Sequence, residues 1–149
     1  MRAVIQRVTR AQVEVEGRVL GEIGEGLLVL VAVERGDEDS DLDFLKRKIL
    51  QLRIFDDGTG KMNLSAQDFG AEIMVISQFT LIGNTRKGNR PSFSRAARPE
   101  IASTLYEALI DALRAEGMRV ENGQFQALMN VTLTNYGPVT LVVDSKQAF

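Results

Sequence analysis

The sequence predicts a single α+β domain, residues 1–149, in which two main helices pack on a curved, largely antiparallel β-sheet with a barrel-like core. Three observations support this class. Short runs rich in β-branched residues occur near both ends of the chain, one run contains no polar residue, and two segments between the ends carry apolar residues at helical spacing. A chain of 149 residues suits one compact unit that folds without disulfides or metal ions.

The first part of the chain has the pattern of four strands. Ala3–Val8 and Ala11–Glu16 are rich in β-branched residues, and the second alternates strictly between apolar and polar side chains. The Gly17-Arg18 pair predicts a tight turn into a strand over Val19–Ile23. Leu27–Val33 has no polar residue, so we expect both faces of this strand to be buried in the sheet.

Two later segments have the spacing of amphipathic helices. Asp39-Ser40-Asp41 offers N-capping groups to the first helix. Its apolar residues recur every three or four positions, at Leu42, Leu45, Ile49 and Leu52. The second helix is expected to begin at Pro99, a residue tolerated in a first turn, and to end near Gly117. Its apolar face consists of Ile101, Leu105, Leu109 and Leu113.

The remaining extended segments lie between and after these helices. Asp56–Gly60 predicts a turn between two short strands. Ile73–Leu81 predicts another apolar strand, which ends in polar residues. Near the C-terminus, Asn130–Thr134 and Val139–Val143 predict two strands joined by a turn at Asn135–Pro138.

The composition restricts the chemistry of any active site. The chain contains no His, no Cys and no Trp. It therefore has no Ser-His-Asp triad, no Cys-His pair, no thiolate zinc site and no imidazole-bound metal. We expect no metal and no other cofactor, so catalysis would have to use carboxylates, Lys, Tyr, hydroxyls, backbone groups or the substrate itself.

The apolar runs argue against membrane insertion. The longest of them, Leu27–Val33, is too short to span a bilayer, and the first residues lack the apolar core of a signal peptide. We therefore expect a cytoplasmic protein that does not associate with a membrane.

Charge is distributed unevenly along the chain. The net charge is −2, yet no acidic residue lies between Glu72 and Glu100. That interval carries five cations, Arg86, Lys87, Arg90, Arg95 and Arg98. Because salt screens charge within about 10 Å at 0.1 M, local charge rather than the total attracts a polyanion. The interval is a candidate phosphate-binding loop, and the alternative is a solvated loop whose arginines pair with surface carboxylates elsewhere.

Three segments are candidates for a functional site, and each also has a structural interpretation. Ser77-Gln78-Phe79-Thr80 ends a buried strand, where polar groups either face a cleft or simply bond nearby backbone. At Gly137-Pro138 the absence of a Cβ lets carbonyl groups approach a ligand, although a plain turn is the simpler interpretation. Phe125, with Met129 after it, would stack on a nucleobase or belong to the core.

Together these segments resemble the D-aminoacyl-tRNA deacylase family. The resemblance runs almost end to end, in the order of the family's motifs. It rests on Val4–Ala11, Gly24, Gly26–Leu30, Arg53–Phe55, Gly60–Leu64, Ser77–Leu81, Arg90–Phe93, Gly123–Phe125 and Asn135–Thr140. The resemblance implies a homodimer that hydrolyses the ester between a D-amino acid and the 3′-terminal adenosine of tRNA, which clears mischarged tRNA.

The resemblance also implies roles for individual residues. Ser77-Gln78-Phe79-Thr80 would form the floor of the pocket and its oxyanion donors. Gly137-Pro138 would enter the active site of the partner subunit, where its carbonyls would hold the substrate's amino group and leave no room for an L side chain. Arg7 would steady that segment, and Phe125 and Met129 would lie near the terminal adenosine. Separately, we expect the five cations of the basic interval to bind phosphates of the acceptor stem.

The implied reaction suits a chain without histidine. An aminoacyl ester is already activated, so its hydrolysis needs an attacking water, correct orientation of that water and stabilisation of the oxyanion. A backbone N–H group that donates to the oxyanion typically contributes about 3–4 kcal/mol. The resemblance implies that the neighbouring ribose 2′-OH orients or activates the water. The alternative makes Thr80 the nucleophile, but no histidine is present to activate its hydroxyl.

Two other classes of function remain open on the sequence. A nucleic-acid-binding module without catalytic activity would bind uncharged RNA or DNA through the basic interval. An esterase for a small free substrate would ignore the body of the tRNA and would depend little on salt.

Overall fold

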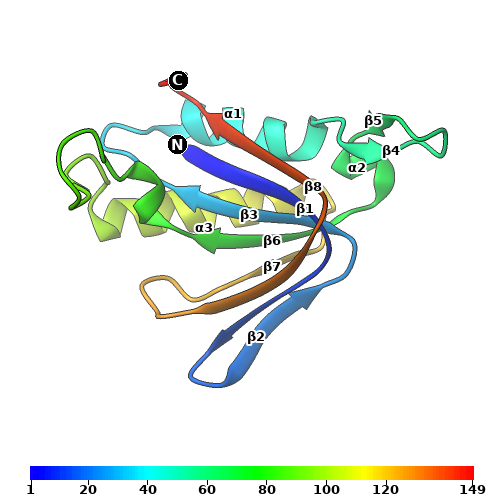
Figure 1. Ribbon diagram of the computed structural model, residues 1–149, viewed down its shortest axis with the longest axis horizontal. Coiled ribbons are helices and arrows are strands. Elements are labelled where there is room, and N and C mark those ends of the chain that lie inside the picture. Colours follow the sequence, from blue (N-terminus) through cyan, green and yellow to red (C-terminus); the bar gives the residue numbers. More distant parts are fainter.

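The computed structural model describes all 149 residues and shows a mixed sheet that curves almost into a barrel (Figure 1). The strands are β1 (Arg2–Val15), β2 (Arg18–Ile23), β3 (Gly26–Ala32), β4 (Phe55–Asp56), β5 (Met62–Leu64), β6 (Glu72–Ser77), β7 (Val120–Asn122) and β8 (Asn130–Asp144). The helices are α1 (Asp39–Gln51), α2 (Ala66–Phe69) and α3 (Pro99–Ala115), and a short 3₁₀ helix, η1, covers Phe79–Ile82. The predicted α+β class is confirmed.

The main sheet is mixed: three of its five strand pairings are antiparallel, as the prediction of a largely antiparallel sheet requires, and two are parallel, which was not predicted. β1 pairs antiparallel with β2, β3 and β8. β3 and β6 are parallel, and so are β6 and β7. The reason is that α1 lies between β3 and β6 in the chain, and α3 lies between β6 and β7. A helical crossover returns the chain to the same end of the sheet, which gives parallel neighbours.

Two pairs of predicted strands are each one continuous strand. Ala3–Val8 and all of Ala11–Glu16 except Glu16 itself belong to β1, whose first half pairs with β3 and whose second half pairs with β2. The two C-terminal segments both belong to β8, which follows β1 along almost its whole length (Figure 1). The predicted turn at Asn135–Pro138 is therefore wrong. These residues form an irregularity inside β8, where β8 advances five residues while β1 advances two.

Other boundaries also differ from the prediction. β6 ends at Ser77, before the predicted end at Leu81, because the chain turns there into η1. The N-cap of α1 is Glu38, one position before the predicted caps, and it forms a capping box with Asp41. α3 begins at Pro99, as predicted, and ends at Ala115. The short elements α2 and β7 were not predicted.

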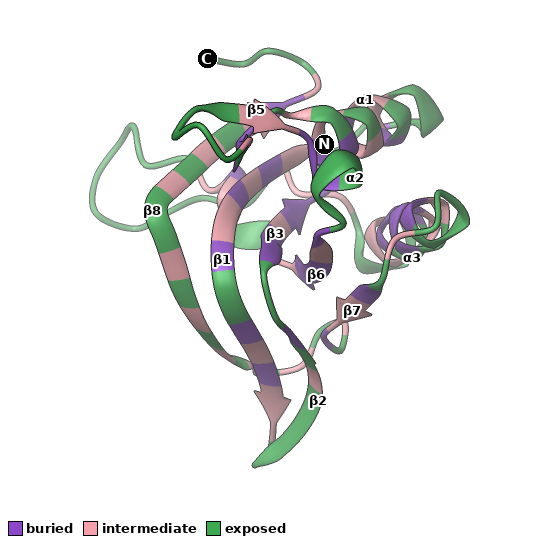
Figure 2. Ribbon diagram, turned by 90° about the vertical axis from the view of Figure 1, so that its right-hand side faces the viewer, coloured by how far each residue is buried: buried purple, intermediate pink, exposed green.

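The core lies between the sheet and the helices. Figure 2 shows buried residues along β1, β3 and β6 and on the faces of α1 and α3 that point toward the sheet. In the predicted strand Leu27–Val33 only Leu30 is not fully buried, which confirms the expected burial of both faces. Of the predicted helix faces, Ile101 is exposed and Leu52 is half-buried, whereas the others are buried. The helices fall short of the length and apolarity that a membrane span requires.

Gly26 marks the tightest approach within the sheet. It pairs with Val8 of β1 on one side and with Glu72 of β6 on the other. A Cβ at this position would overlap the carbonyl oxygen of Glu72. The parallel pairing of β3 with β6 therefore requires glycine here.

We predict that Gly26→Ala lowers the free energy of unfolding by about 3 kcal/mol, because the backbone of β6 must move away from the new methyl group. The measurement is urea denaturation. Gly24→Ala is the matched control, since the nearest atom to its Cβ would be 3.9 Å away. Equal unfolding free energies for the two variants would contradict this account of β3.

Candidate functional site

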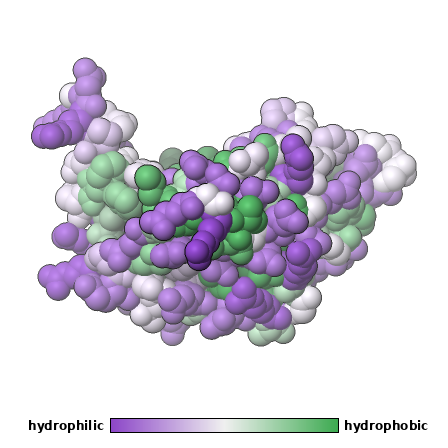
Figure 3. Space-filling model, turned by 90° about the horizontal axis from the view of Figure 1, so that it is seen from below, coloured by the Kyte–Doolittle hydropathy of each residue, from purple (hydrophilic) through white to green (hydrophobic).

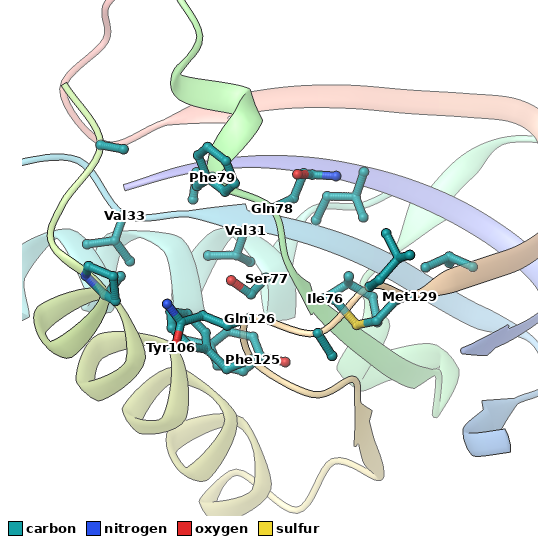
Figure 4. A pocket seen from close by; sticks show the side chains of 18 of the residues that line it. Val31, Val33, Ile76, Ser77, Gln78, Phe79, Tyr106, Phe125, Gln126 and Met129 are labelled. Atoms are coloured by element: carbon teal, nitrogen blue, oxygen red, sulfur yellow. The ribbon is translucent and has the colours of Figure 1, made fainter. Parts of the chain in front are cut away.

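A cavity of about 840 Å³ lies beside the carboxyl end of β6, between α3 and the segment that leads into β8 (Figure 4). Its wall is mostly apolar and includes residues of β1, β3, β6, α3 and β8. The polar side chains on the wall are Gln6, Ser77, Gln78, Tyr106 and Gln126. A large apolar pocket with a few polar groups is the usual form of a small-molecule site.

The predicted Ser77–Thr80 segment forms one end of this cavity. Ser77, Gln78 and Phe79 line it, whereas Thr80 does not. The Thr80 hydroxyl instead donates a hydrogen bond of 2.7 Å to Oε1 of Gln78. Figure 4 shows the Ser77 side chain near the middle of the labelled residues, with Phe79 above it in the view.

The backbone of this segment has N–H groups available for a ligand. The N–H of Gln78 donates to the carbonyl of Val31 at 2.7 Å and is therefore occupied. Phe79 and Thr80 begin the 3₁₀ helix η1, and the first N–H groups of a helix have no carbonyl partner within it. These two N–H groups are the available donors at this end of β6.

Phe125 and Met129 both line the cavity. The Phe125 ring lies 5.9 Å from that of Tyr106, and Phe125 also packs against the main core. It is thus part of the core and of the cavity wall at once. Met129 approaches Gly123 so closely that a Cβ on Gly123 would overlap its sulfur atom. Figure 4 shows Met129 beside Ile76, away from Phe125.

Tyr106 is a wall residue that the sequence analysis did not single out. Its hydroxyl donates a 2.9 Å hydrogen bond to the carbonyl of Val75 in β6. Burial raises the pKa of Tyr106 to about 12, so the phenol stays protonated at neutral pH. Its position next to Leu105 on the apolar side of the predicted helix was the only signal for it, and that signal indicates burial rather than a site.

Gly137-Pro138 lies outside this cavity. Both residues are exposed, and neither is part of the cavity wall. Their peptide bond is cis. Gly137 has φ +116°, and a Cβ there would be 2.9 Å from both Nη2 of Arg7 and the backbone N of Val139. This position therefore requires glycine. A single chain does not bring this segment together with Ser77-Gln78-Phe79-Thr80.

Arg7 lies against the Gly137-Pro138 segment. Its Nε donates to the carbonyl of Tyr136 at 3.2 Å, and its Nη1 donates to the carbonyl of Ile54 at 2.7 Å. Its guanidinium also lies over the Tyr136 ring, 4.6 Å from the centroid. Arg7 thus connects the irregular part of β8 to the segment just before β4.

The five predicted phosphate-binding residues fall into two groups. Asn84 and Ser92 exchange backbone hydrogen bonds of 2.8 and 3.0 Å, which closes a loop that carries Arg86, Lys87 and Arg90. These three cations are exposed and form no ion pair, and we call them the loop-tip cations. Arg95 pairs with Glu34, as the alternative interpretation of the sequence expects for a loop arginine. Arg98 is exposed and is the N-cap of α3.

The surface seen from below is not uniformly polar. Figure 3 shows hydrophobic side chains gathered on this face between hydrophilic ones. Several large hydrophobic residues are exposed in the single chain, among them Phe79, Tyr136 and Leu128, the last of which is 94% exposed. Apolar side chains that gather on a surface often take part in contacts with another molecule.

The sequence of this chain is similar to those of known deacylases over nearly its whole length. A family model described as D-Tyr-tRNA(Tyr) deacylase matches residues 4–144. The D-aminoacyl-tRNA deacylases of Desulfitobacterium hafniense and Thermosipho africanus are 56% and 54% identical to this chain over 149 residues, and each match covers both proteins completely.

Solved structures share the fold. One described as c-Myc DNA Unwinding Element Binding Protein has a TM-score of 0.91 and 40% identity, and the match covers 97% of this chain and 98% of that one. A probable eukaryotic D-amino acid tRNA deacylase has a TM-score of 0.83 at 20% identity, with 96% and 98% covered, and supports the fold alone. The matched residues include the end of β6, the cavity wall and Gly137-Pro138. The resemblance seen in the sequence is confirmed, and the chain belongs to the D-Tyr-tRNA(Tyr) deacylase family.

Proposed function

We propose that this protein hydrolyses the ester bond of D-aminoacyl-tRNA and releases the free D-amino acid and tRNA. Family membership supports the reaction class. The observation that carries the proposal is the cavity at the end of β6, where the wall residue Phe79 and its neighbour Thr80 have backbone N–H groups without a carbonyl partner in η1. Such a site accepts the side chain of an aminoacyl group and stabilises negative charge on its carbonyl oxygen.

The reaction needs no ionisable catalyst from the protein. Water attacks the ester carbonyl, and the N–H groups of Phe79 and Thr80 donate to the oxyanion that forms, at about 3–4 kcal/mol per donor. The ester C–O bond then breaks, and the 3′ oxygen of the terminal ribose takes up a proton. The adjacent 2′-OH of the substrate orients the water, a role that a histidine often has in other hydrolases and that no histidine can have in this chain.

Selection between D and L substrates requires a second copy of the chain. Gly137-Pro138 is exposed and lies outside the cavity of its own subunit, so its carbonyls reach a substrate only across an interface. They accept hydrogen bonds from the substrate's ammonium group and occupy the space that an L side chain would need. A thousandfold selectivity corresponds to about 4 kcal/mol, which a steric clash with fixed backbone can supply. The proposal therefore includes a homodimer.

The rest of the tRNA extends beyond the cavity. Phe125 and Met129 lie in the wall, where they would contact the terminal adenosine. The loop-tip cations, with Arg98, would contact phosphates of the acceptor stem. Arg95 is the weakest of the five candidates, because Glu34 already neutralises it. Since tRNA is charged and used in the cytoplasm, the proposal places the protein there.

A nucleic-acid-binding module is the second candidate function. The 40% identical structure is described as a DNA unwinding element binding protein, and this chain carries unpaired cations at the loop tip. This candidate predicts binding of duplex DNA or uncharged RNA without turnover of any ester.

The first prediction concerns the reaction itself. The protein should deacylate D-tyrosyl-tRNA about a thousandfold faster than L-tyrosyl-tRNA, and EDTA should leave both rates unchanged. The measurement is release of labelled tyrosine. Binding of duplex DNA with neither ester cleaved would favour the nucleic-acid-binding module. Cleavage of a small free tyrosyl ester at the same rate as the tRNA ester would favour a general esterase.

The second prediction concerns Thr80. Its hydroxyl bonds Gln78 and does not line the cavity, so Thr80→Ala should retain the deacylation rate within about threefold, as expected for loss of one exposed hydrogen bond. Single-turnover rates on D-tyrosyl-tRNA measure this, with circular dichroism to establish that the variant is folded. Complete loss of activity in a folded variant would instead make Thr80 the nucleophile.

The third prediction concerns the loop tip. Replacing Arg86 and Lys87 together by Glu should weaken tRNA binding and reduce the slope of log Kd against log salt by about two. Replacing exposed Arg18 and Lys61 by Glu changes the net charge equally and is the control. If both double variants bind tRNA with the same affinity and salt slope, the loop tip has no role in phosphate binding.

A further inference from the structure

Asn135 lies at the point where β8 leaves its regular pairing with β1. Val8 pairs with Asn135, and the next pair toward the C-terminus of β8 is Gln6 with Thr140. Arg7, between Gln6 and Val8, has no partner residue in β8. The four residues 136–139, which include Gly137-Pro138, thus have no partner in β1. Contacts other than backbone pairing must therefore fix the conformation of this segment.

The Asn135 side chain provides contacts on both sides of this irregularity. Its Nδ2 donates to the carbonyls of Arg7 and Val139, at 3.0 Å each. Its Oδ1 accepts from Nε2 of Gln6 at 3.2 Å and lies 3.1 Å from the Thr140 hydroxyl. A primary amide has two donor hydrogens and two acceptor lone pairs, so this side chain uses both donors and, when the Thr140 hydroxyl donates to Oδ1, both acceptors.

Thr140 extends the same set of contacts to the carbonyl of Pro138. Its Oγ1 lies 3.2 Å from that carbonyl oxygen and 3.1 Å from Oδ1 of Asn135. The hydroxyl carries one hydrogen and donates to one of them at a time, while Nε2 of Gln6 is 3.4 Å from Oγ1. Gln6 also lines the cavity of its own chain. The network therefore joins that cavity to the segment which, in the proposed dimer, serves the partner's cavity.

We propose that Asn135 and Thr140 are positioning residues for chiral selection: they fix the direction of the Gly137 and Pro138 carbonyls that meet the substrate's ammonium group. This inference rests on the proposed function, because the direction of the two carbonyls affects selectivity only if they bind the ammonium group of the substrate. Arg7 holds the segment from the Tyr136 side, and the amide of Asn135 closes it from the Val139 side. Neither Asn135 nor Thr140 touches the reacting atoms.

The test compares Asn135→Ala and Thr140→Val with matched variants on the same strand. Asn130→Ala removes an amide whose one hydrogen bond is an exposed contact with Glu14, and Thr134→Val removes an exposed hydroxyl. Steady-state rates on D-tyrosyl-tRNA and L-tyrosyl-tRNA give the D to L selectivity, kcat and KM. The ¹⁵N shift of the Gly137 amide reports the local backbone without any substrate.

In Asn135→Ala the D to L selectivity should fall at least tenfold and KM for the D substrate should rise, because the carbonyls no longer meet the ammonium group. Thr140→Val keeps the shape of the side chain and should lower selectivity about threefold. Both variants should shift the Gly137 resonance, whereas Asn130→Ala and Thr134→Val should change neither selectivity nor that resonance.

Unchanged selectivity and an unchanged Gly137 shift in folded Asn135→Ala would overturn the proposal. If that variant does not fold, Thr140→Val decides by the same two criteria. A wild-type protein that cleaves neither ester would remove the proposed function, whereas the Gly137 shift would still show whether Asn135 and Thr140 hold the segment. An equal loss of kcat on both substrates, with selectivity kept, would assign them a purely structural role.

Discussion

The antiparallel pairing of β1 with β8 is the contact on which both proposed functional regions depend. Where the pairing is regular, Val131 and Leu133 of β8 contribute to the cavity wall, and Gln6 of β1 contributes to it at the edge of the irregularity. Where it is interrupted, β8 presents Gly137-Pro138 to the surface. One pair of strands therefore builds a binding cavity and a separate exposed backbone segment, and their relative position is set by the register of a single ladder.

The proposed mechanism relies on main-chain groups because the chain contains neither histidine nor cysteine. Backbone N–H groups at the start of η1 and backbone carbonyls at Gly137-Pro138 keep their polarity at every pH near neutrality, unlike an imidazole or a thiol. Their direction depends on the packing around them, from Tyr106 beneath β6 and from Arg7 beside β8. Precision in such a site comes from the rigidity of the scaffold rather than from tuned pKa values.

The sequence predicts those parts of the fold that local patterns determine. The helix faces follow from apolar spacing, and Pro99 marks the start of α3. Strand continuity could not be predicted, because Pro138 is compatible with β8 only through the unpaired, irregular position that tertiary contacts create. The parallel pairings depend on crossovers, and the contact between Arg95 and Glu34 joins residues 61 positions apart, which no local pattern specifies. The sequence predicted Ser77, Gln78 and Phe79 as site residues, and they line the cavity, whereas the pattern around Tyr106 is only that of a core residue.

β8 pairs with no strand other than β1, so its outer side is an open edge 15 residues long. Such an edge is a template for adding strands from other molecules, and long flat ones promote aggregation. The interruption at Gly137-Pro138 divides this edge, and proline removes an N–H donor from it. The break in regular structure that is proposed to offer carbonyl groups to a substrate therefore also interrupts the edge along which other chains could add strands.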